Sequence, residues 1–259
     1  MSPRSVSWVF PGFASRSDLY LAAAAGAALG LHYAVWFVSL EYTSVGSSTT
    51  LVTLQPIFVV LFSYFVFRER AGAMSLAGLL LAIAGAFVIT SSDAMFSRDH
   101  LYGDVLALGA AVLIAVYIMI GRSVRHRVET LRYMNVVYAS GALVLLIVCL
   151  LAKEALFGYE PRQWWVFAGL AFVSTLLGHT LLNWLLGSLR ASTVSIFFLG
   201  EPVGASILAY LLLGETMGVR QMSGALLVLI GIAVFLLGGE ARNRPLSGEG
   251  KGAASPPST

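Results

Sequence analysis

The sequence predicts an all-α membrane protein, a polytopic bundle of about eight transmembrane helices arranged as an inverted repeat of three plus five. Three observations predict this fold class. The 259 residues have a mean hydropathy of +0.84, and only 11% of them are charged, against about 25% in an ordinary soluble domain. Apolar stretches long enough to cross a bilayer recur along the chain. The second half of the chain also repeats a pattern of the first half.

A helix needs about 20 apolar residues to cross the hydrocarbon layer of a membrane. Apolar runs of this length are expected to be helical, because lipid offers no hydrogen bonds to their backbone. In chain order the predicted spans are 19–40, 42–67, 71–92, 105–121, 133–152, 163–189, 191–214 and 221–239. The remaining ends predict a cytoplasmic N-terminal segment, 1–18, and a disordered cytoplasmic tail, 240–259, which is rich in Gly, Pro, Ser and charge.

Lysine and arginine set the predicted orientation, because they collect in cytoplasmic loops. With the N-terminus inside, twelve of the 16 Lys and Arg residues fall in cytoplasmic segments, and the others are Arg98, Lys153, Arg162 and Arg220. The sequence therefore predicts a multi-pass protein of the plasma (inner) membrane with both termini cytoplasmic. The lipid bilayer is an expected partner. Nucleic acid is not, because the positive charge lies in scattered loops and forms no basic stripe.

A shift of 146 residues brings the two halves of the chain into register without a gap. Restrictive or charged residues then coincide: Pro56 with Pro202, Glu69 with Glu215, Gly78 with Gly224, and Gly85 with Gly231. The matching spans 42–67 and 191–214 cross the membrane in opposite directions, so the copies are inverted. We assign 19–92 to a first copy with three spans and 103–239 to a second copy with five. Such inverted repeats are typical of secondary transporters.

Several short segments carry a resemblance to a known family. They are Asn183-Trp184, Ala191-Ser192-Thr193, Leu199-Gly200-Glu201-Pro202-Val203 and Leu213-Gly214-Glu215 in the second copy, and Ser39-Leu40-Glu41-Tyr42-Thr43-Ser44, Pro56 and Arg68-Glu69-Arg70 in the first. Together they resemble an EamA-type transporter of the drug/metabolite transporter superfamily. The resemblance covers about residues 19–239 and implies a transporter of small metabolites.

The first copy departs from the pattern of this family, which has ten helices in two copies of five. It resembles a copy that lacks the family's first two transmembrane helices. Two explanations stay open. Either the start of the chain is assigned too late, or the protein is an eight-helix variant that a homodimer would complete.

Glu201 is the one charged residue deep within a predicted span. A charge at that depth is costly, which makes Glu201 a functional candidate. Pro202 follows it and interrupts the helix, and Gln55-Pro56 occupies the matching place in the first copy. The two helix breaks predict a substrate-binding site at the repeat interface. Glu201 would cycle a proton or pair with a cationic substrate there; the alternative is a protonated side chain that only bonds its neighbours.

Polar and aromatic side chains of other spans are further candidates for the substrate site. His179 and Asn183 are four residues apart and share a helix face, His32 lies one turn before Trp36, and Tyr117 completes the set. The alternative for this set is hydrogen bonding between helices. Because no cluster of metal ligands accompanies either histidine, neither a metal nor a cofactor is expected.

The sequence predicts no enzyme, because it holds no Gly-x-Ser-x-Gly elbow, no His-Glu-x-x-His motif and no P-loop. The leading hypothesis is a secondary transporter that exports amino acids or related small-molecule substrates by alternating access, with proton coupling as one source of energy. The alternatives are an intramembrane enzyme acting on lipid or peptide, and a truncated, non-transporting membrane protein.

Overall fold

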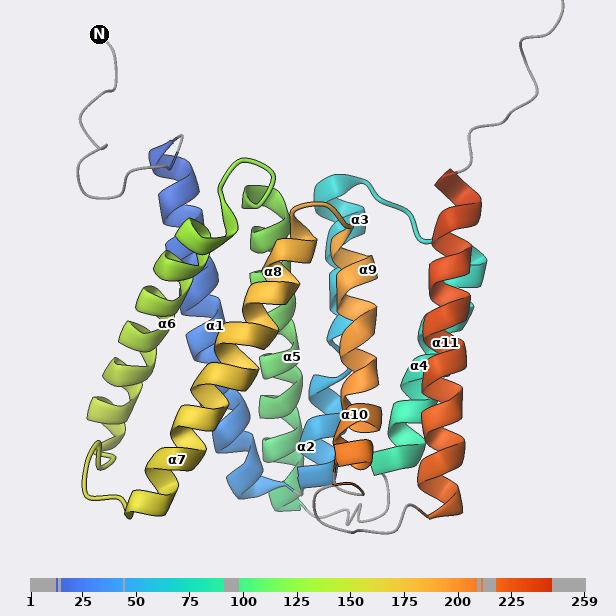
Figure 1. Cartoon of the computed structure of the whole chain (residues 1–259). Helices are drawn as coiled ribbons and strands as arrows, with labels where there is room; N and C mark the ends of the chain where they lie inside the picture. The colour runs from blue at the N-terminus through green and yellow to red at the C-terminus, as the bar shows by residue number, and fades with distance from the viewer. Residues whose placement is uncertain are drawn as a thin grey trace, which may run out of the picture.

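The protein is a bundle of helices that run alternately down and up (Figure 1). The computed structural model describes residues 13, 15–43, 45–90, 98–208, 211 and 218–243, and every regular element in these ranges is a helix. The prediction of an all-α polytopic membrane protein is confirmed. In chain order the elements are α1 (Arg16–Tyr42), α2 (Val45–Val52), α3 (Gln55–Phe67), α4 (Ala73–Thr90), α5 (Arg98–Val124), α6 (Thr130–Ala152), α7 (Pro161–Gly169), the π-helix η2 (Leu170–His179), α8 (Thr180–Leu186), α9 (Ala191–Ile196), the 3₁₀ helix η3 (Phe197–Gly200), α10 (Glu201–Leu208) and α11 (Val219–Asn243).

Each predicted span corresponds to a helix or to an interrupted helix. Within the described residues, five helices are long and apolar enough to cross a membrane, and shorter apolar helices cover 55–67, 73–88 and 191–200. Most of the predicted N-terminal segment and tail lies outside the described residues. The tail prediction was wrong at its start, because α11 continues to Asn243 and residues 240–243 are therefore helical.

Two of the predicted spans are interrupted near their middle. Helix α2 ends at Val52, a turn follows at Thr53 and Leu54, and α3 begins at Gln55 with Pro56 in its first turn. In the second half, α9 passes through the 3₁₀ helix η3 before α10 begins at Glu201. A proline in the first turn is favourable, because the amide hydrogen that it lacks would have no helical partner there.

The starts of these helices repeat the 146-residue offset of the sequence. Val45 and Ala191 begin α2 and α9, Gln55 and Glu201 begin α3 and α10, and Ala73 and Val219 begin α4 and α11. The backbone is therefore interrupted at equivalent places in both halves. The domain limits 19–92 and 103–239 remain a prediction.

Glycines shared by the two copies let α4 and α11 pack against each other. A Cβ atom added to Gly78 would lie 2.7 Å from the carbonyl oxygen of Gly231, and one added to Gly85 would lie 2.7 Å from that of Gly224. Each contact joins one glycine of the first copy to one of the second. The crosswise pairing is what a pseudo-twofold axis between α4 and α11 requires, and close approach through small residues is a common way to pack helices in lipid.

Helix α1 packs against α5 and α6. Its counterpart in the second copy, formed by α7, η2 and α8, is exposed along the outer side of α7 and η2. A Cβ atom at Gly30 would lie 2.7 Å from the carbonyl oxygen of Gly141 in α6. No residue of α7 is buried, and His179 is the one buried residue of η2. Within the described residues, no helix covers the outer face of α7 and η2.

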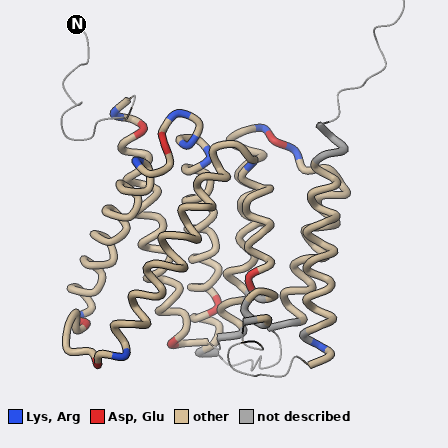
Figure 2. The backbone as a smooth tube through the Cα atoms, in the orientation of Figure 1, with Lys and Arg blue, Asp and Glu red and all other residues tan. Residues whose placement is uncertain are grey.

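Charged residues gather at the two ends of the bundle (Figure 2). The end where α1 begins and α11 ends also carries the α3–α4, α5–α6 and α8–α9 connections (Figure 1). Arginines are concentrated in these connections, at Arg68, Arg70, Arg125, Arg127 and Arg190. We call this end the arginine-rich end.

Candidate functional site

A polar network in the middle of the bundle joins α1, α5, η2 and α8. Its centre is the imidazole of His179, the last residue of η2. The Nε2 atom of this ring lies 2.9 Å from the hydroxyl oxygen of Tyr33, and the Nδ1 atom lies 3.3 Å from that of Tyr117. π-Helical turns are rare and are frequent at functional sites. The unusual turn therefore ends at the residue that contacts both other helices.

Asn183 supports this network from one turn further along. Its Nδ2 atom donates a hydrogen bond to the His179 carbonyl oxygen at 2.8 Å and a second one to the Tyr117 hydroxyl. Asn183 and Tyr117 are fully buried. Both residues were predicted to bind substrate. In the structure they form hydrogen bonds with His179 and hold it in position.

His32 and Trp36 lie beside the network on α1. The Nδ1 atom of His32 is 2.8 Å from the carbonyl oxygen of Ala110, and the His32 ring stacks on Trp36 with 5.9 Å between ring centroids. The His32 ring also lies 5.2 Å from the ring of Tyr33. The indole Nε1 of Trp36 is buried and has no hydrogen-bond partner among the described residues. Buried donors are nearly always paired in proteins, so this atom is available to a ligand.

Gln55 and Glu201 start the second halves of the two interrupted helices. Gln55 is buried at the start of α3, whereas Glu201 is exposed at the start of α10. Glu201 lies within electrostatic reach of the Tyr33 hydroxyl. Glu201 therefore contributes to the electrostatic surroundings of Tyr33, whereas Gln55 is buried in the packing of α3. Pro56 and Pro202 directly follow them, in the first turns of α3 and α10.

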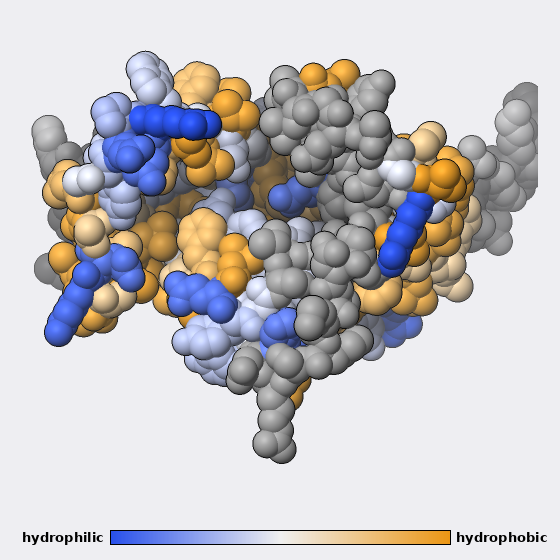
Figure 3. All heavy atoms as spheres, turned by 90° about the horizontal axis from the view of Figure 1, so that it is seen from below, coloured by the Kyte–Doolittle hydropathy of each residue, from blue (hydrophilic) through white to orange (hydrophobic). Residues whose placement is uncertain are grey.

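The end of the bundle opposite the arginine-rich end is hollowed near its middle. Figure 3 shows this face from below, with hydrophilic and hydrophobic atoms both visible in the depth of the hollow. Helix α10, which begins with Glu201, lies in this lower part of the bundle (Figure 1). Helix α10 therefore lies toward the hollowed end, whereas α8, whose Asn183 carbonyl accepts a hydrogen bond from Arg125, lies toward the arginine-rich end (Figure 1).

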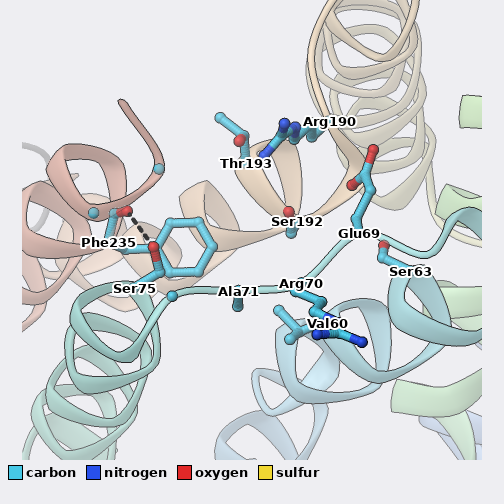
Figure 4. Close-up of a pocket in the computed structure, with 13 residues that line it drawn as sticks. Val60, Ser63, Glu69, Arg70, Ala71, Ser75, Arg190, Ser192, Thr193 and Phe235 are labelled. Atoms are coloured by element: carbon cyan, nitrogen blue, oxygen red, sulfur yellow. Dashed lines mark hydrogen bonds between the residues drawn. The ribbon is translucent and has the colours of Figure 1, made fainter. Parts of the chain in front are cut away.

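A narrow cavity lies at the arginine-rich end, where α3, α4, α9 and α11 meet. Its volume is about 30 Å³, room for one or two water molecules. Figure 4 shows Glu69, Arg190 and Thr193 on one side of it, and Ser75 bonded to the Phe235 carbonyl oxygen on another. The Oε2 atom of Glu69 is buried, and none of the described residues forms a hydrogen bond with it. Residues from both halves of the chain line this cavity. Its small volume leaves little room for a solute.

Two residues of the site were missed by the sequence analysis. Tyr33 could have been found, because it lies 146 residues before His179. Arg125 had no such signal. It is buried, and it donates from Nε to the Asn183 carbonyl oxygen at 2.8 Å and from its other nitrogens to the Val128 carbonyl and the Thr130 hydroxyl. This arginine ties the α5–α6 connection to the helix that carries Asn183.

A second arginine of the same connection holds the start of α1. Arg127 forms an ion pair of 2.7 Å with Asp18. The Asp18 carboxylate raises the pKa of Arg127 by hydrogen bonding to it. Ser15 caps the same helix by accepting a hydrogen bond from the Asp18 backbone amide. The N-terminal end of α1 is thus fixed to the second copy.

The described residues contain no group of three His, Cys, Asp or Glu side chains that could hold a metal ion. The network offers instead hydroxyl, imidazole, amide and aromatic groups with one carboxylate nearby. Such a lining suits an organic solute with few polar groups.

Comparisons with known proteins identify a family, two transporter relatives and a similar fold. The sequence profile of the EamA-like transporter family matches residues 4–91 and 101–237. A probable amino-acid metabolite efflux pump of Salmonella typhimurium is 27% identical over 221 residues, which are 81% of this chain and 74% of that protein. An uncharacterized transporter of Archaeoglobus fulgidus is 28% identical over 205 residues, 75% of this chain and 69% of the relative. A crystal structure with 21% identity shares the fold, with a TM-score of 0.74 over 88% of this chain and 81% of the other.

Proposed function

The chain belongs to the EamA-like transporter family and is a membrane transporter, and from this premise we propose that it moves small metabolites by alternating access at the interface of its two repeats. One observation carries the proposal. Tyr33 and His179 occupy equivalent positions of the two copies and contact each other in the middle of the bundle. A solute site at that contact would be shared by both copies, which is the arrangement that a rocking mechanism needs.

Glu201 is the ionisable group of the proposed site. It would either pair with a substrate amine or carry a proton, as a carboxylate inside a transporter does when it couples transport to a proton gradient. The substrate class that we propose is amino acids or related metabolites, moved out of the cell. Support comes from the mixed apolar and polar lining and from the name of the Salmonella relative, an amino-acid metabolite efflux pump.

The orientation that we propose places the arginine-rich end and both termini in the cytoplasm of a cell with this protein in its plasma (inner) membrane. The concentration of Lys and Arg at that end supports it. The hollow then opens outward, and the narrow cavity beside Glu69 lies at the closed, cytoplasmic end. The structure would correspond to an outward-open state.

Transport by purified protein in lipid vesicles tests the proposal. A panel of labelled amino acids and related metabolites would be loaded and their efflux measured with and without a pH gradient. We expect the Glu201→Gln variant to lose at least about tenfold in rate for the transported compound, because the loss of one ionic partner is worth about 1.4 kcal/mol or more. Glu129→Gln is the matched control, since Glu129 is exposed and forms a surface ion pair with Arg132. Unchanged rate and pH dependence in Glu201→Gln would contradict the role of Glu201.

A further inference from the structure

The amide of Asn183 sets the direction of two hydrogen bonds beside His179. The carbonyl oxygen of His179 can only accept a hydrogen bond, so the atom of Asn183 that lies 2.8 Å from it must be the nitrogen Nδ2. The second hydrogen of this nitrogen is donated to the hydroxyl oxygen of Tyr117. Tyr117 therefore accepts from Asn183 and keeps its own hydrogen for another partner.

The next hydrogen bond joins the Tyr117 hydroxyl to the imidazole of His179. The Tyr117 hydroxyl lies 3.3 Å from Nδ1 of His179, and its remaining hydrogen can be donated to that nitrogen. A neutral imidazole that accepts at one nitrogen carries its hydrogen on the other. In this tautomer Nε2 bears the hydrogen and donates it to the hydroxyl oxygen of Tyr33, 2.9 Å away. The order of donation in this tautomer is Asn183 to Tyr117 to His179 to Tyr33.

Tyr33 ends this chain with a hydroxyl hydrogen that the network does not use. The Tyr33 side chain is half-buried, in contrast to the fully buried Tyr117. Glu201 lies within electrostatic reach of the same hydroxyl. The chain of donors thus leaves the Tyr33 hydroxyl hydrogen available for a partner outside the network.

We propose that Tyr33 is a substrate-binding residue, and that its hydroxyl donates a hydrogen bond to a carboxylate or carbonyl oxygen of a substrate whose ammonium group pairs with Glu201. The substrate class is then an α-amino acid rather than a simple amine. This inference rests on the proposed function, since it assigns a substrate to the same site. Tyr117 and Asn183 act through His179 and are positioning residues.

The direction of the hydrogen bonds can be measured without a substrate. Nitrogen NMR of protein labelled with ¹⁵N-histidine distinguishes the two neutral tautomers, and the His179→Gln variant identifies the His179 signals among those of the four histidines. We expect the tautomer with hydrogen on Nε2. Hydrogen on Nδ1 would overturn the proposal, because Tyr33 would then have to donate to His179 and would have no hydrogen left for a substrate.

Binding of two compounds tests the contact itself. L-Leucine carries an ammonium and a carboxylate, and 3-methylbutylamine is the same molecule without the carboxylate. We expect Tyr33→Phe to weaken leucine binding about tenfold to a hundredfold, the usual effect of losing a hydrogen bond to a charged group, and to leave the amine unchanged. Tyr20→Phe is the control, since Tyr20 lies on the same helix and is 69% exposed.

The other outcomes are also decisive. An equal loss for both compounds would indicate a structural role for Tyr33 and overturn the proposal, as would no loss for either. Wild-type protein that binds neither compound but exports another metabolite overturns the assigned substrate class. If the proposed function is wrong, none of the compounds in the panel will be transported. The NMR measurement then tests the direction of the hydrogen bonds independently of transport.

Discussion

Tyr33 and His179 are separated by 146 residues, the offset of the internal repeat, and their side chains lie 2.9 Å apart. Equivalent positions of two copies can touch only where the axis that relates the copies passes between them. The same axis passes between α4 and α11, where Gly78 meets Gly231 and Gly85 meets Gly224. The polar network therefore lies at the axis between the two copies.

The first prediction concerns the packing of α4 on α11. A Cβ atom at Gly85 would lie 2.6 Å from the backbone nitrogen of Val228. We expect Gly85→Ala to destabilise the protein by about 1–3 kcal/mol, because the helices must separate to admit the methyl group. Denaturation of the purified protein in mixed micelles would measure this. Gly169→Ala is the control, because nothing lies within 4 Å of a Cβ there, and a result as large as that of Gly85→Ala would contradict the prediction.

The second prediction concerns Arg125, whose guanidinium bonds to three acceptors in different directions. Lysine keeps the charge but cannot reach several acceptors with one planar group. Arg125→Lys should therefore lose about 2 kcal/mol of stability, the typical worth of a hydrogen bond to a charged group. The same denaturation assay applies. Arg132→Lys should behave as wild type, since Arg132 is about half exposed, and equal stability of the two variants would argue against a clamping role.

Much of the fold could be predicted from the sequence, because a bilayer imposes simple rules. Each crossing needs an apolar stretch, so hydropathy found every helical segment of the described residues. Proline lacks an amide hydrogen, so Pro56 and Pro202 marked the places where two spans are interrupted. The repeat of these residues at a fixed offset also predicted that the two interruptions would be equivalent.

The site could be predicted only in part, because hydrogen-bond partners depend on tertiary packing. Four polar candidates, His32, Tyr117, His179 and Asn183, lie in or beside the network, but their spacing did not indicate that Tyr117 and Asn183 would be fully buried. The π-helix that ends at His179 was not predicted, since no local pattern in its sequence distinguishes it from an α-helix. Arg125 looked like one more loop arginine, because no local pattern distinguishes a buried guanidinium from a solvated one.

The third prediction tests the orientation of the protein. Single cysteines would replace Arg127 and Arg162 in turn, in protein whose one native cysteine, Cys149, is changed to serine. These positions lie at opposite ends of the bundle, in the α5–α6 connection and at the start of α7. If the arginine-rich end is cytoplasmic, a membrane-impermeant maleimide added to intact cells should label position 162 and spare position 127. Labelling of position 127 alone would reverse the topology.

The fourth prediction concerns the unpaired indole nitrogen of Trp36. A buried donor without a partner costs about 1–3 kcal/mol, so Trp36→Phe should leave the stability unchanged within about 1 kcal/mol, with the relief of this cost offsetting the smaller ring. If a substrate oxygen accepts from this nitrogen, the same variant should raise the apparent KM for efflux about fivefold, which corresponds to about 1 kcal/mol, the typical contribution of one hydrogen bond. Transport would then weaken while stability stays the same. His32, which stacks on Trp36 and bonds to the Ala110 carbonyl, offers the contrast: His32→Phe removes a bond within the protein and should reduce stability as well as transport. Trp36→Phe with reduced stability and unchanged KM would show that the indole only fills space beside the network.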